Sequence, residues 1–333
     1  MRSLGTVGNE PVTAVIQMDN RFCGIMPTNA SAADSSTSVT PGVRFCRPVI
    51  SGSSDATYWM RSLAINALWA ARWGYLHLTY CAHECPHQDS GEARHVVWCK
   101  IVALAHAMAR LPQDAMVLYL DSDAWWDAAD LSLPALLHWQ ASTSILMFAC
   151  NWPYLACRAH GRRGCGTEWN KSLKRSPPNT GVVLARNTVR ARALLQLWWN
   201  TPSMVDATDV VGCPEQQALW HLMSASKDFR QDVGVFTNSE TSPWYNSSGW
   251  LACMQTNMAQ LYQPMRPPIV QVDHFFELKS RRTRYNEMAT SIPLDNATQW
   301  CSSYVRLSEA SSTHIGLGGP LLKSATCVNR SAG

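Results

Sequence analysis

The sequence predicts an α/β protein in which a mixed, mainly parallel sheet is flanked by helices within a single domain. Apolar runs with the length of strands alternate along the chain with longer segments whose apolar residues recur at helical spacing. The run 116–120 is apolar throughout, as expected for a strand that is buried on both faces of a parallel sheet. With 333 residues, of which 46% are hydrophobic, the chain can bury one large core.

Each expected element rests on such a pattern. Val97, Ile101 and Leu104 share one face of the expected helix 96–110, and Gly74 is a stop signal after the helix 58–72. Strands that alternate with helices imply parallel pairing through right-handed crossovers. The expected strands cover residues 13–18, 75–80, 116–120, 145–149, 182–185, 233–236 and 269–272, and the expected helices cover residues 58–72, 96–110, 188–199 and 214–224.

Composition divides the chain into successive stretches. Residues 1–57 contain the first expected strand, 13–18, and then a long loop over 27–57 that is rich in Ser, Thr, Ala and Pro. Residues 58–303 are expected to form the folded domain together with the strand 13–18. The tail 304–333 is rich in Ser, Gly and Ala, and we expect it to be flexible.

The charge pattern speaks against nucleic acid as a partner. The chain has 28 Lys and Arg against 24 Asp and Glu, a net charge of +4, and no long run of like charge. Basic residues cluster only locally, at 158–163 and 279–284. A local basic cluster beside acidic metal ligands suits a phosphate-bearing small molecule better than a polymer.

Cysteines and glycosylation sequons favour the lumen of the secretory pathway. The chain has 12 Cys, an even number whose pairing cannot be derived from the sequence, and five N-x-S/T sequons. The alternative is a reducing compartment with ordinary buried cysteines. No apolar stretch reaches the ~20 residues that span a bilayer, and no signal-peptide pattern opens the chain. A membrane contact would therefore need an anchor that is not seen in this sequence.

The most informative motif is Asp121-Ser122-Asp123, which follows the apolar strand 116–120 directly. Open α/β sheets bind ligands at the carboxyl ends of their strands. Two carboxylates there can share Mn²⁺ or Mg²⁺, which would also take diphosphate oxygens. The plain alternative is a solvated turn in which one aspartate caps the next helix.

A phosphatase of the haloacid-dehalogenase type is another alternative, with Asp121 as its nucleophile. Such enzymes place their motif on the first strand and continue it with x-Thr or x-Val. Here about 115 residues precede the motif, and Ala124 follows it. Both observations favour a metal site over the phosphatase.

Several segments resemble, in order, the galactosyl/xylosyl/mannosyl transferase family of yeast mannan and plant xyloglucan synthesis. The matching segments are Trp98-Cys99-Lys100, Asp121-Ser122-Asp123-Ala124, Asn179-Thr180-Gly181, Pro214–Leu219 and His274–Lys279. The chain departs from the family at Glu215, where the family has Asp, and after His274, where it lacks Gly-Cys. The segment 157–176 has no counterpart in the family.

The resemblance implies a GT-A-like (Rossmann-like) fold and a metal-dependent, configuration-retaining glycosyltransferase of the Golgi or secretory-pathway lumen. Its donor would be a UDP- or GDP-sugar, and its acceptor a hydroxyl group of a glycan or glycoprotein. The neighbouring family of extensin and pectin glycosyltransferases, with the same fold and a similar Asp-x-Asp strand, is one alternative, and a catalytically silent sugar-binding module is another.

The resemblance also implies a role for each site residue. The metal ligands would be Asp121, Asp123 and His274; the donor-binding residues Lys100, Ser122, Asn179, Thr180 and Gly181; and the catalytic residues Glu215, Gln216 and Lys279. Lys279 would neutralise the departing diphosphate. Glu215 and Gln216 would stabilise oxocarbenium character, or Glu215 would act as a nucleophile. Each residue also has a structural alternative, such as a surface lysine, a turn residue or a carboxylate at a helix start.

A cluster of Cys and His residues and a group of tryptophans each have a functional and a structural interpretation. Cys81, His83, Cys85 and His87 resemble zinc ligands, but no second ligand pair follows at standard spacing, so a disulfide or a loop is preferred. The tryptophans between residues 59 and 199 are mostly expected in the core, although Trp125, Trp126 and Trp152 could form sugar-stacking platforms near the site.

Overall fold

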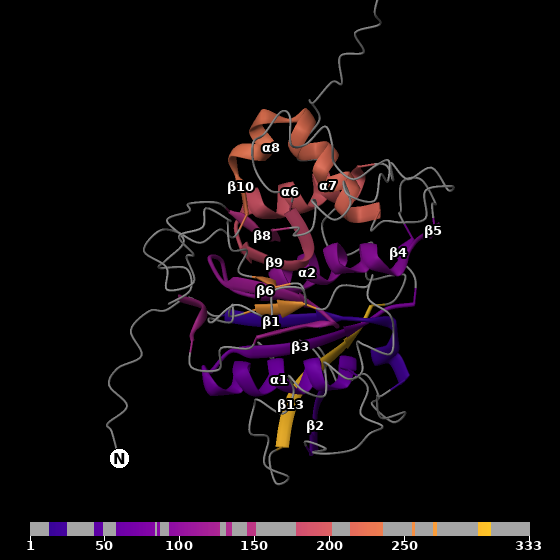
Figure 1. The fold of residues 1–333 in the computed structure, drawn as a ribbon, viewed down its shortest axis with the longest axis vertical. Coiled ribbons are helices and arrows are strands. Elements are labelled where there is room, and N and C mark those ends of the chain that lie inside the picture. Colours follow the sequence, from indigo (N-terminus) through magenta and orange to yellow (C-terminus); the bar gives the residue numbers. More distant parts are fainter. Residues whose placement is uncertain are drawn as a thin grey trace, which may run out of the picture.

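An eight-stranded sheet forms the centre of the computed structural model, with the strand order β10-β8-β9-β6-β1-β3-β13-β2 (Figure 1). The structure describes residues 13–24, 43–48, 58–83, 85–86, 93–126, 131–134, 145–150, 178–201, 214–235, 255–256, 269–271 and 299–307. The strands of the sheet are β1 (Thr13–Met18), β2 (Val43–Pro48), β3 (Leu76–Cys81), β6 (Met116–Asp121), β8 (Leu146–Cys150), β9 (Pro178–Arg186), β10 (Val233–Val235) and β13 (Gln299–Arg306).

The sheet is mixed but mainly parallel. β1 is parallel to both of its neighbours, β3 and β6, and β13 is parallel to β3. β9 is antiparallel to β6 and to β8, and β2 is antiparallel to β13. The remaining strands therefore all run in one direction, and the predicted fold class is confirmed.

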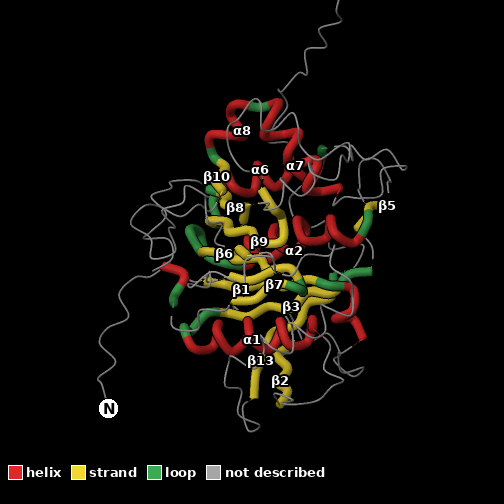
Figure 2. Tube along the Cα trace, viewed as in Figure 1, coloured by secondary structure: helices red, strands yellow, loops and turns green. Residues whose placement is uncertain are grey.

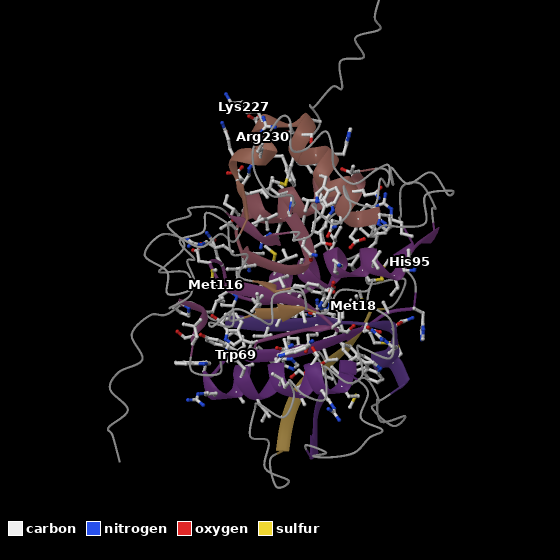
Figure 3. The ribbon with its side chains drawn as sticks, in the orientation of Figure 1. Met18, Trp69, His95, Met116, Lys227 and Arg230 are labelled. Atoms are coloured by element: carbon white, nitrogen blue, oxygen red, sulfur yellow. A yellow bond between two sulfur atoms is a disulfide. The ribbon has the colours of Figure 1, made fainter. Side chains whose placement is uncertain are left out.

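Helices cover both faces of this sheet (Figures 1 and 2). α1 (Tyr58–Arg72) covers one face, whereas α2 (Cys99–Arg110), α6 (Val189–Asn200) and α7 (Pro214–Ala225) lie on the other. The short helix α8 (Lys227–Gln231) extends the second layer, and Lys227 and Arg230 mark its outer end in Figure 3. Two 3-10 helices, η1 (Asn20–Gly24) and η2 (Val96–Trp98), follow β1 and precede α2.

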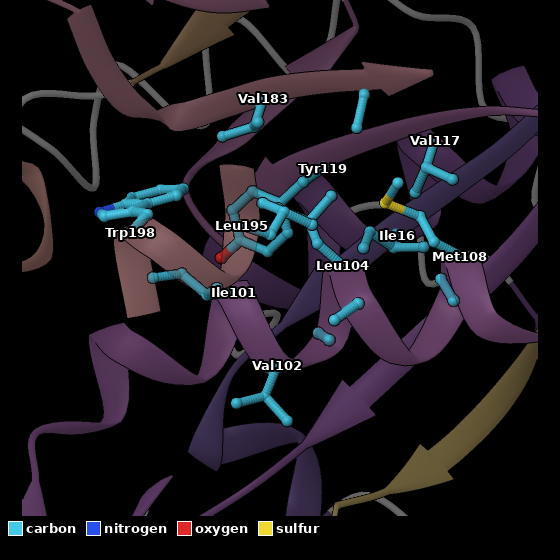
Figure 4. Close-up of a cluster of buried hydrophobic side chains, with 14 of the residues drawn as sticks. Ile16, Ile101, Val102, Leu104, Met108, Val117, Tyr119, Val183, Leu195 and Trp198 are labelled. Atoms are coloured by element: carbon cyan, nitrogen blue, oxygen red, sulfur yellow. The ribbon is translucent and has the colours of Figure 1, made fainter. Parts of the chain in front are cut away.

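Alternation along the strands divides the core into two layers. Ile16 of β1 packs in the same cluster as Leu104 of α2 and Val117 of β6 (Figure 4). Val15 points to the opposite face and packs in the cluster that contains Trp69 of α1. Successive strand residues point to opposite faces, so even-numbered residues of β1 face α2 and odd-numbered ones face α1. Each fully buried Ile or Leu contributes roughly 1.5–3 kcal/mol of transfer free energy.

The predicted division of the chain into a loop, a folded domain and a tail was wrong at two places. β2 (Val43–Pro48) lies within the stretch 27–57 that we expected to be a loop, and β13 crosses the boundary expected at residue 303. These strands pair with each other, and β13 also pairs with β3. Because their pairing partners are distant in sequence, local composition did not reveal them.

A second sheet lies beside the first, with the strand order β11-β12-β7. It consists of β11 (Gln255–Thr256), β12 (Ile269–Gln271) and β7 (Ala124–Trp126). β12 corresponds to the strand expected at 269–272. A separate pair is formed by β4 (Cys85–Pro86) and β5 (Ala93–Arg94).

Disulfides connect β3 to η1 and β4 to α2. Cys23 is bonded to Cys81, and Cys85 is bonded to Cys99. Cys301 of β13 is disulfide-bonded as well. Since Cys81 and Cys85 are both used in this way, the preference for disulfides over a zinc site is confirmed. None of the helices in the described ranges has the length and apolar character needed to cross a membrane.

Candidate active site

Two neighbouring parallel strands end side by side at one edge of the central sheet. Met18, the last residue of β1, is paired with Asp121, the last residue of β6. Asp19 follows β1 and is only 8% exposed. Ser122 and Asp123 complete the turn after β6, which we call the Asp121–Asp123 turn. Open α/β sheets bind ligands at the carboxyl ends of their strands, so this edge is the candidate site.

Asp121 lies between a cation and a phenol. Lys100 Nζ is 3.2 Å from Asp121 Oδ1, and the Tyr119 hydroxyl donates to the same oxygen at 2.7 Å. Burial raises the pKa of Asp121 above its ordinary value; Lys100 and the Tyr119 hydroxyl oppose the rise, and the charges of Asp123 and Glu215 add to it. Burial beside this carboxylate also raises the pKa of Tyr119, so the phenol keeps its proton and stays a donor.

Arg21, which follows β1, binds the middle residue of the Asp121–Asp123 turn. Arg21 of η1 donates from its guanidinium to Ser122 Oγ at 2.8 Å and is ion-paired with Asp19. Ser122 and Asp123 are 7% and 3% exposed. Because the turn is buried and leads into strand β7, the alternative of a solvated turn that caps a helix is wrong.

A buried ion pair joins α2 to α7 beside this turn. Lys100 Nζ is 3.0 Å from Glu215 Oε1, and the Thr180 hydroxyl donates to the same oxygen at 3.0 Å. Lys100 also donates to the carbonyl oxygen of Thr180 at 3.3 Å. The structure therefore brings together three residues that the sequence placed in separate segments. All three are buried, so Lys100 is not a surface lysine.

The start of β9 lies at the same edge, because β9 is antiparallel to β6. Gln216 Oε1 accepts a hydrogen bond from the backbone N–H of Thr180 at 3.0 Å. Asn179 Oδ1 accepts one from the backbone N–H of Gly181 at 2.7 Å. The side-chain oxygen of Asn179 therefore forms the local turn bond that is typical of Asn, as the structural alternative for this residue proposed.

The two carboxylate oxygens of Glu215 differ in their hydrogen bonding. Glu215 Oε2 is buried and has no hydrogen-bond partner within the part of the chain that the structure describes. A buried acceptor without a partner is costly, and such atoms in native proteins call for an explanation, such as a water, an ion or a ligand. A ligand hydroxyl could donate the missing hydrogen bond.

The turn suits a hard divalent cation. Asp121 and Asp123 supply carboxylate oxygens, which Mn²⁺ and Mg²⁺ prefer. Among the described residues, no group of three or more His, Cys, Asp or Glu side chains is arranged to hold a metal ion. A cation here would therefore take other ligands from a diphosphate, from water or from a residue outside these ranges. It would also share Asp121 with Lys100.

No protein-family model matches the sequence, and no curated protein matches it. Two glycosyltransferases are among the solved structures that resemble the chain. One is a glycosyltransferase involved in the glycosylation of the major capsid of PBCV-1, with 9% identity and a TM-score of 0.46 over 85% of this chain and 100% of that chain. The other is the galactosyltransferase LgtC in complex with donor and acceptor sugar analogues, with 12% identity and a TM-score of 0.42 over 85% of this chain and 96% of that chain. Both TM-scores are below 0.5, so neither likeness assigns a function to this chain.

Two predicted residues lie outside the described ranges. These are His274 and Lys279, and their roles stay predictions. The described strand before them, β12, is antiparallel to β7 and pairs Gln271 with Ala124. Ala124 follows Asp123 directly, so the described chain that precedes His274 ends beside the turn.

Sequence reasoning missed three residues of this site: Asp19, Arg21 and Tyr119. Asp19 follows an apolar strand just as Asp121 does, so the same strand-end rule would have found it. Arg21 and Tyr119 have no such signal, because only the fold brings them to Ser122 and Asp121.

The expected stacking platforms were wrong for two tryptophans. Trp125 and Trp126 are 2% and 0% exposed, and Trp126 stacks on Trp69 with ring centroids 3.9 Å apart. Both rings belong to the interior, and Trp126 packs in the same cluster as Trp69 of α1. Trp152 lies outside the described residues.

Proposed function

We propose that this protein is a metal-dependent glycosyltransferase of the GT-A type. It would move a sugar from a UDP- or GDP-sugar to a hydroxyl group of a glycan or glycoprotein. The observation that carries the proposal is the convergence at one strand edge of a two-carboxylate turn and the buried Lys100–Glu215 pair, 3.2 Å from Asp121. A nucleotide sugar needs both features, namely a cation site for its diphosphate and fixed polar groups for its sugar.

The residues of the turn would hold the donor through a cation. Mn²⁺ or Mg²⁺ would supply positive charge that stabilises the leaving diphosphate. Asp121 and Asp123 would bind the cation, with His274 as the proposed third ligand. Lys279 would contact the phosphate oxygens and neutralise the charge that develops on them.

Glu215 would act on the sugar. Lys100 and Thr180 both bind its Oε1, which leaves Oε2 to accept a hydrogen bond from a donor hydroxyl. A carboxylate held by two donors suits electrostatic stabilisation of oxocarbenium character better than nucleophilic attack. Gln216 fixes the start of α7 against Thr180 and would assist beside the anomeric carbon. We infer that the anomeric configuration is retained.

The pairing of β12 supports the assignment of His274. Gln271 lies opposite Ala124, next to Asp123, and three peptide units separate Gln271 from His274. At about 3.6 Å per residue, three residues of extended chain can span about 11 Å. A metal shell that includes His274 is therefore within reach of the chain.

The disulfides support a location in the Golgi or secretory-pathway lumen. Cys23–Cys81 and Cys85–Cys99 are disulfides, Cys301 is disulfide-bonded as well, and disulfides persist in oxidising compartments. Any attachment to a membrane would require an anchor besides the described helices.

A screen of UDP- and GDP-sugars with Mn²⁺ tests the proposal. The wild type should hydrolyse or transfer at least one donor, and Asp121→Asn and Asp123→Asn should abolish Mn²⁺-dependent nucleotide binding in calorimetry. Asp228→Asn changes an exposed aspartate of α8 and serves as the matched control. Nucleotide binding without turnover would instead identify a silent sugar-binding module, and a phosphoaspartate at Asp121 would identify a phosphatase.

A further inference from the structure

We propose that Gln17, Ser62 and Asn66 are positioning residues that hold the Asp121–Asp123 turn in the geometry needed for the cation. We call these residues the amide clamp. The inference rests on the proposed function, since it assigns a purpose to buried groups beside the proposed metal ligands. Gln17, Ser62 and Asn66 are 0%, 1% and 0% exposed.

Asn66 replaces a neighbouring strand along β7. Its side-chain Nδ2 donates to the carbonyl oxygen of Ala124 at 3.0 Å, and its Oδ1 accepts from the backbone N–H of Trp126 at 2.9 Å. A residue of a parallel strand uses the same two groups of its partner, the carbonyl of one residue and the N–H two residues later. β12 covers the other edge of β7, so Asn66 completes the pairing of the strand that follows the turn.

Ser62 and Gln17 hold both ends of the turn. Ser62 lies one helical turn before Asn66 on α1 and donates to the same Ala124 oxygen at 2.6 Å. Gln17 is an odd-numbered residue of β1, so it faces α1, and its Nε2 donates to Ser62 Oγ at 3.1 Å and to the carbonyl oxygen of Asp121 at 3.4 Å. Hydrogen bonds therefore connect the residue that opens the turn to the residue that follows it.

Burying the polar side chains of the amide clamp costs free energy, which indicates that their hydrogen bonds to the turn have a role. Asparagine has low helix propensity, and burying an amide or a hydroxyl costs free energy where its hydrogen bonds are not made, as at Gln17 Oε1, which has no partner among the described residues. Apolar side chains would suit the interior of α1 at lower cost. A divalent cation, however, requires its carboxylates to be placed within a few tenths of an ångström, and groups that orient ligands commonly change metal affinity by about 10- to 100-fold when removed. The clamp provides that fixed backbone.

The test compares Asn66→Ala with a control of similar burial. Ser302→Ala removes a buried hydroxyl that bonds His77 and Thr79 between β13 and β3, away from the turn. Both variants should be less stable than the wild type. Only Asn66→Ala should weaken Mn²⁺ binding in the presence of UDP or GDP, by about 10- to 100-fold, as measured by calorimetry or by the resonance of free Mn²⁺. Ser62→Ala removes one bond to the same carbonyl and replaces Asn66→Ala if that variant does not fold.

Hydrogen exchange separates this inference from the proposed function. Asn66→Ala, or Ser62→Ala in its place, should speed the exchange of amides 121–126, whereas Ser302→Ala should not. Unchanged exchange of these amides, or Mn²⁺ affinity equal to that of Ser302→Ala, overturns the clamp. A wild type that binds no metal–nucleotide complex overturns the proposed function, and exchange alone then decides whether the clamp holds the turn.

Discussion

The ammonium group of Lys100 lies 3.0 Å from a carboxylate oxygen of Glu215, and the two side chains are 3% and 0% exposed. A charge buried to this extent is tolerated only with its partner, because the interior solvates it poorly. The pair therefore has a structural role in addition to any role in donor binding.

Lys100→Met should lower the free energy of unfolding by about 3–5 kcal/mol, because it leaves Glu215 as a buried charge without its cation. Denaturation by urea would measure the loss. The double variant Lys100→Met with Glu215→Gln should lose less than the sum of the single variants. Lys227→Met, at an exposed lysine of α8, should change stability by no more than about 0.5 kcal/mol. Equal losses of unfolding free energy in the Lys100 and Lys227 variants would show that the Lys100–Glu215 pair does not contribute to stability.

The pH dependence of metal binding should reflect the raised pKa of Asp121. A metal ligand must be deprotonated, so Mn²⁺ affinity should fall as the pH is lowered, starting above the pKa of ~3.9 of an exposed aspartate. The stability of the metal-free protein should depend on pH in the opposite direction. The raised native pKa of Asp121 favours folding at low pH, and this contribution to stability is lost as the pH rises through the native pKa.

Calorimetric titration of Mn²⁺ with nucleotide at a series of pH values would measure the first effect. Asp121→Asn should show weak binding at every pH. A wild-type affinity that stays constant down to pH ~4 would contradict the expected shift.

His274→Ala and Lys279→Ala should have different effects. Loss of a metal ligand should weaken Mn²⁺ and nucleotide binding together. Loss of Lys279 should leave Mn²⁺ affinity nearly unchanged but lower the transfer rate by about tenfold to a thousandfold, because its charge matters most as the leaving group develops. Calorimetry and initial rates would separate the two, with His221→Ala at an exposed histidine of α7 as control. If both variants behave like that control, these residues are not part of the site.

The reaction should retain the anomeric configuration of the donor. Glu215 is fixed by Lys100 and Thr180, which fits stabilisation of the sugar rather than activation of the acceptor as a general base. Proton NMR of the first product would report the configuration. An inverted product would exclude the resemblance to the retaining family and would give Glu215 the role of a base.

The helices around the site were predictable because their signals are local. α1 and α2 show apolar residues at helical spacing, and Gly74, with a φ of 71°, ends the first of them as expected. β13 was missed because its interior contains polar residues such as Ser302. That hydroxyl is satisfied by His77 and Thr79, more than 200 residues earlier in the chain.

Some residues of the site were predictable from the sequence, but their contacts were not. Asp121 and Asp123 follow from the strand that precedes them, whereas the resemblance named Lys100 and Glu215 separately. Only the fold shows that Lys100 bridges Asp121 and Glu215, and that a single oxygen of Glu215 is left for a ligand.

The reversed direction of β9 has a consequence for protein engineering. The end of β8 and the start of β9 are paired through Cys150 and Pro178, at the edge where β6 ends. The chain of residues 151–177 thus leaves and re-enters the sheet at one place, next to Thr180. Residues 151–177 could therefore be exchanged as one unit, because strand pairing already closes the two points at which they join the sheet.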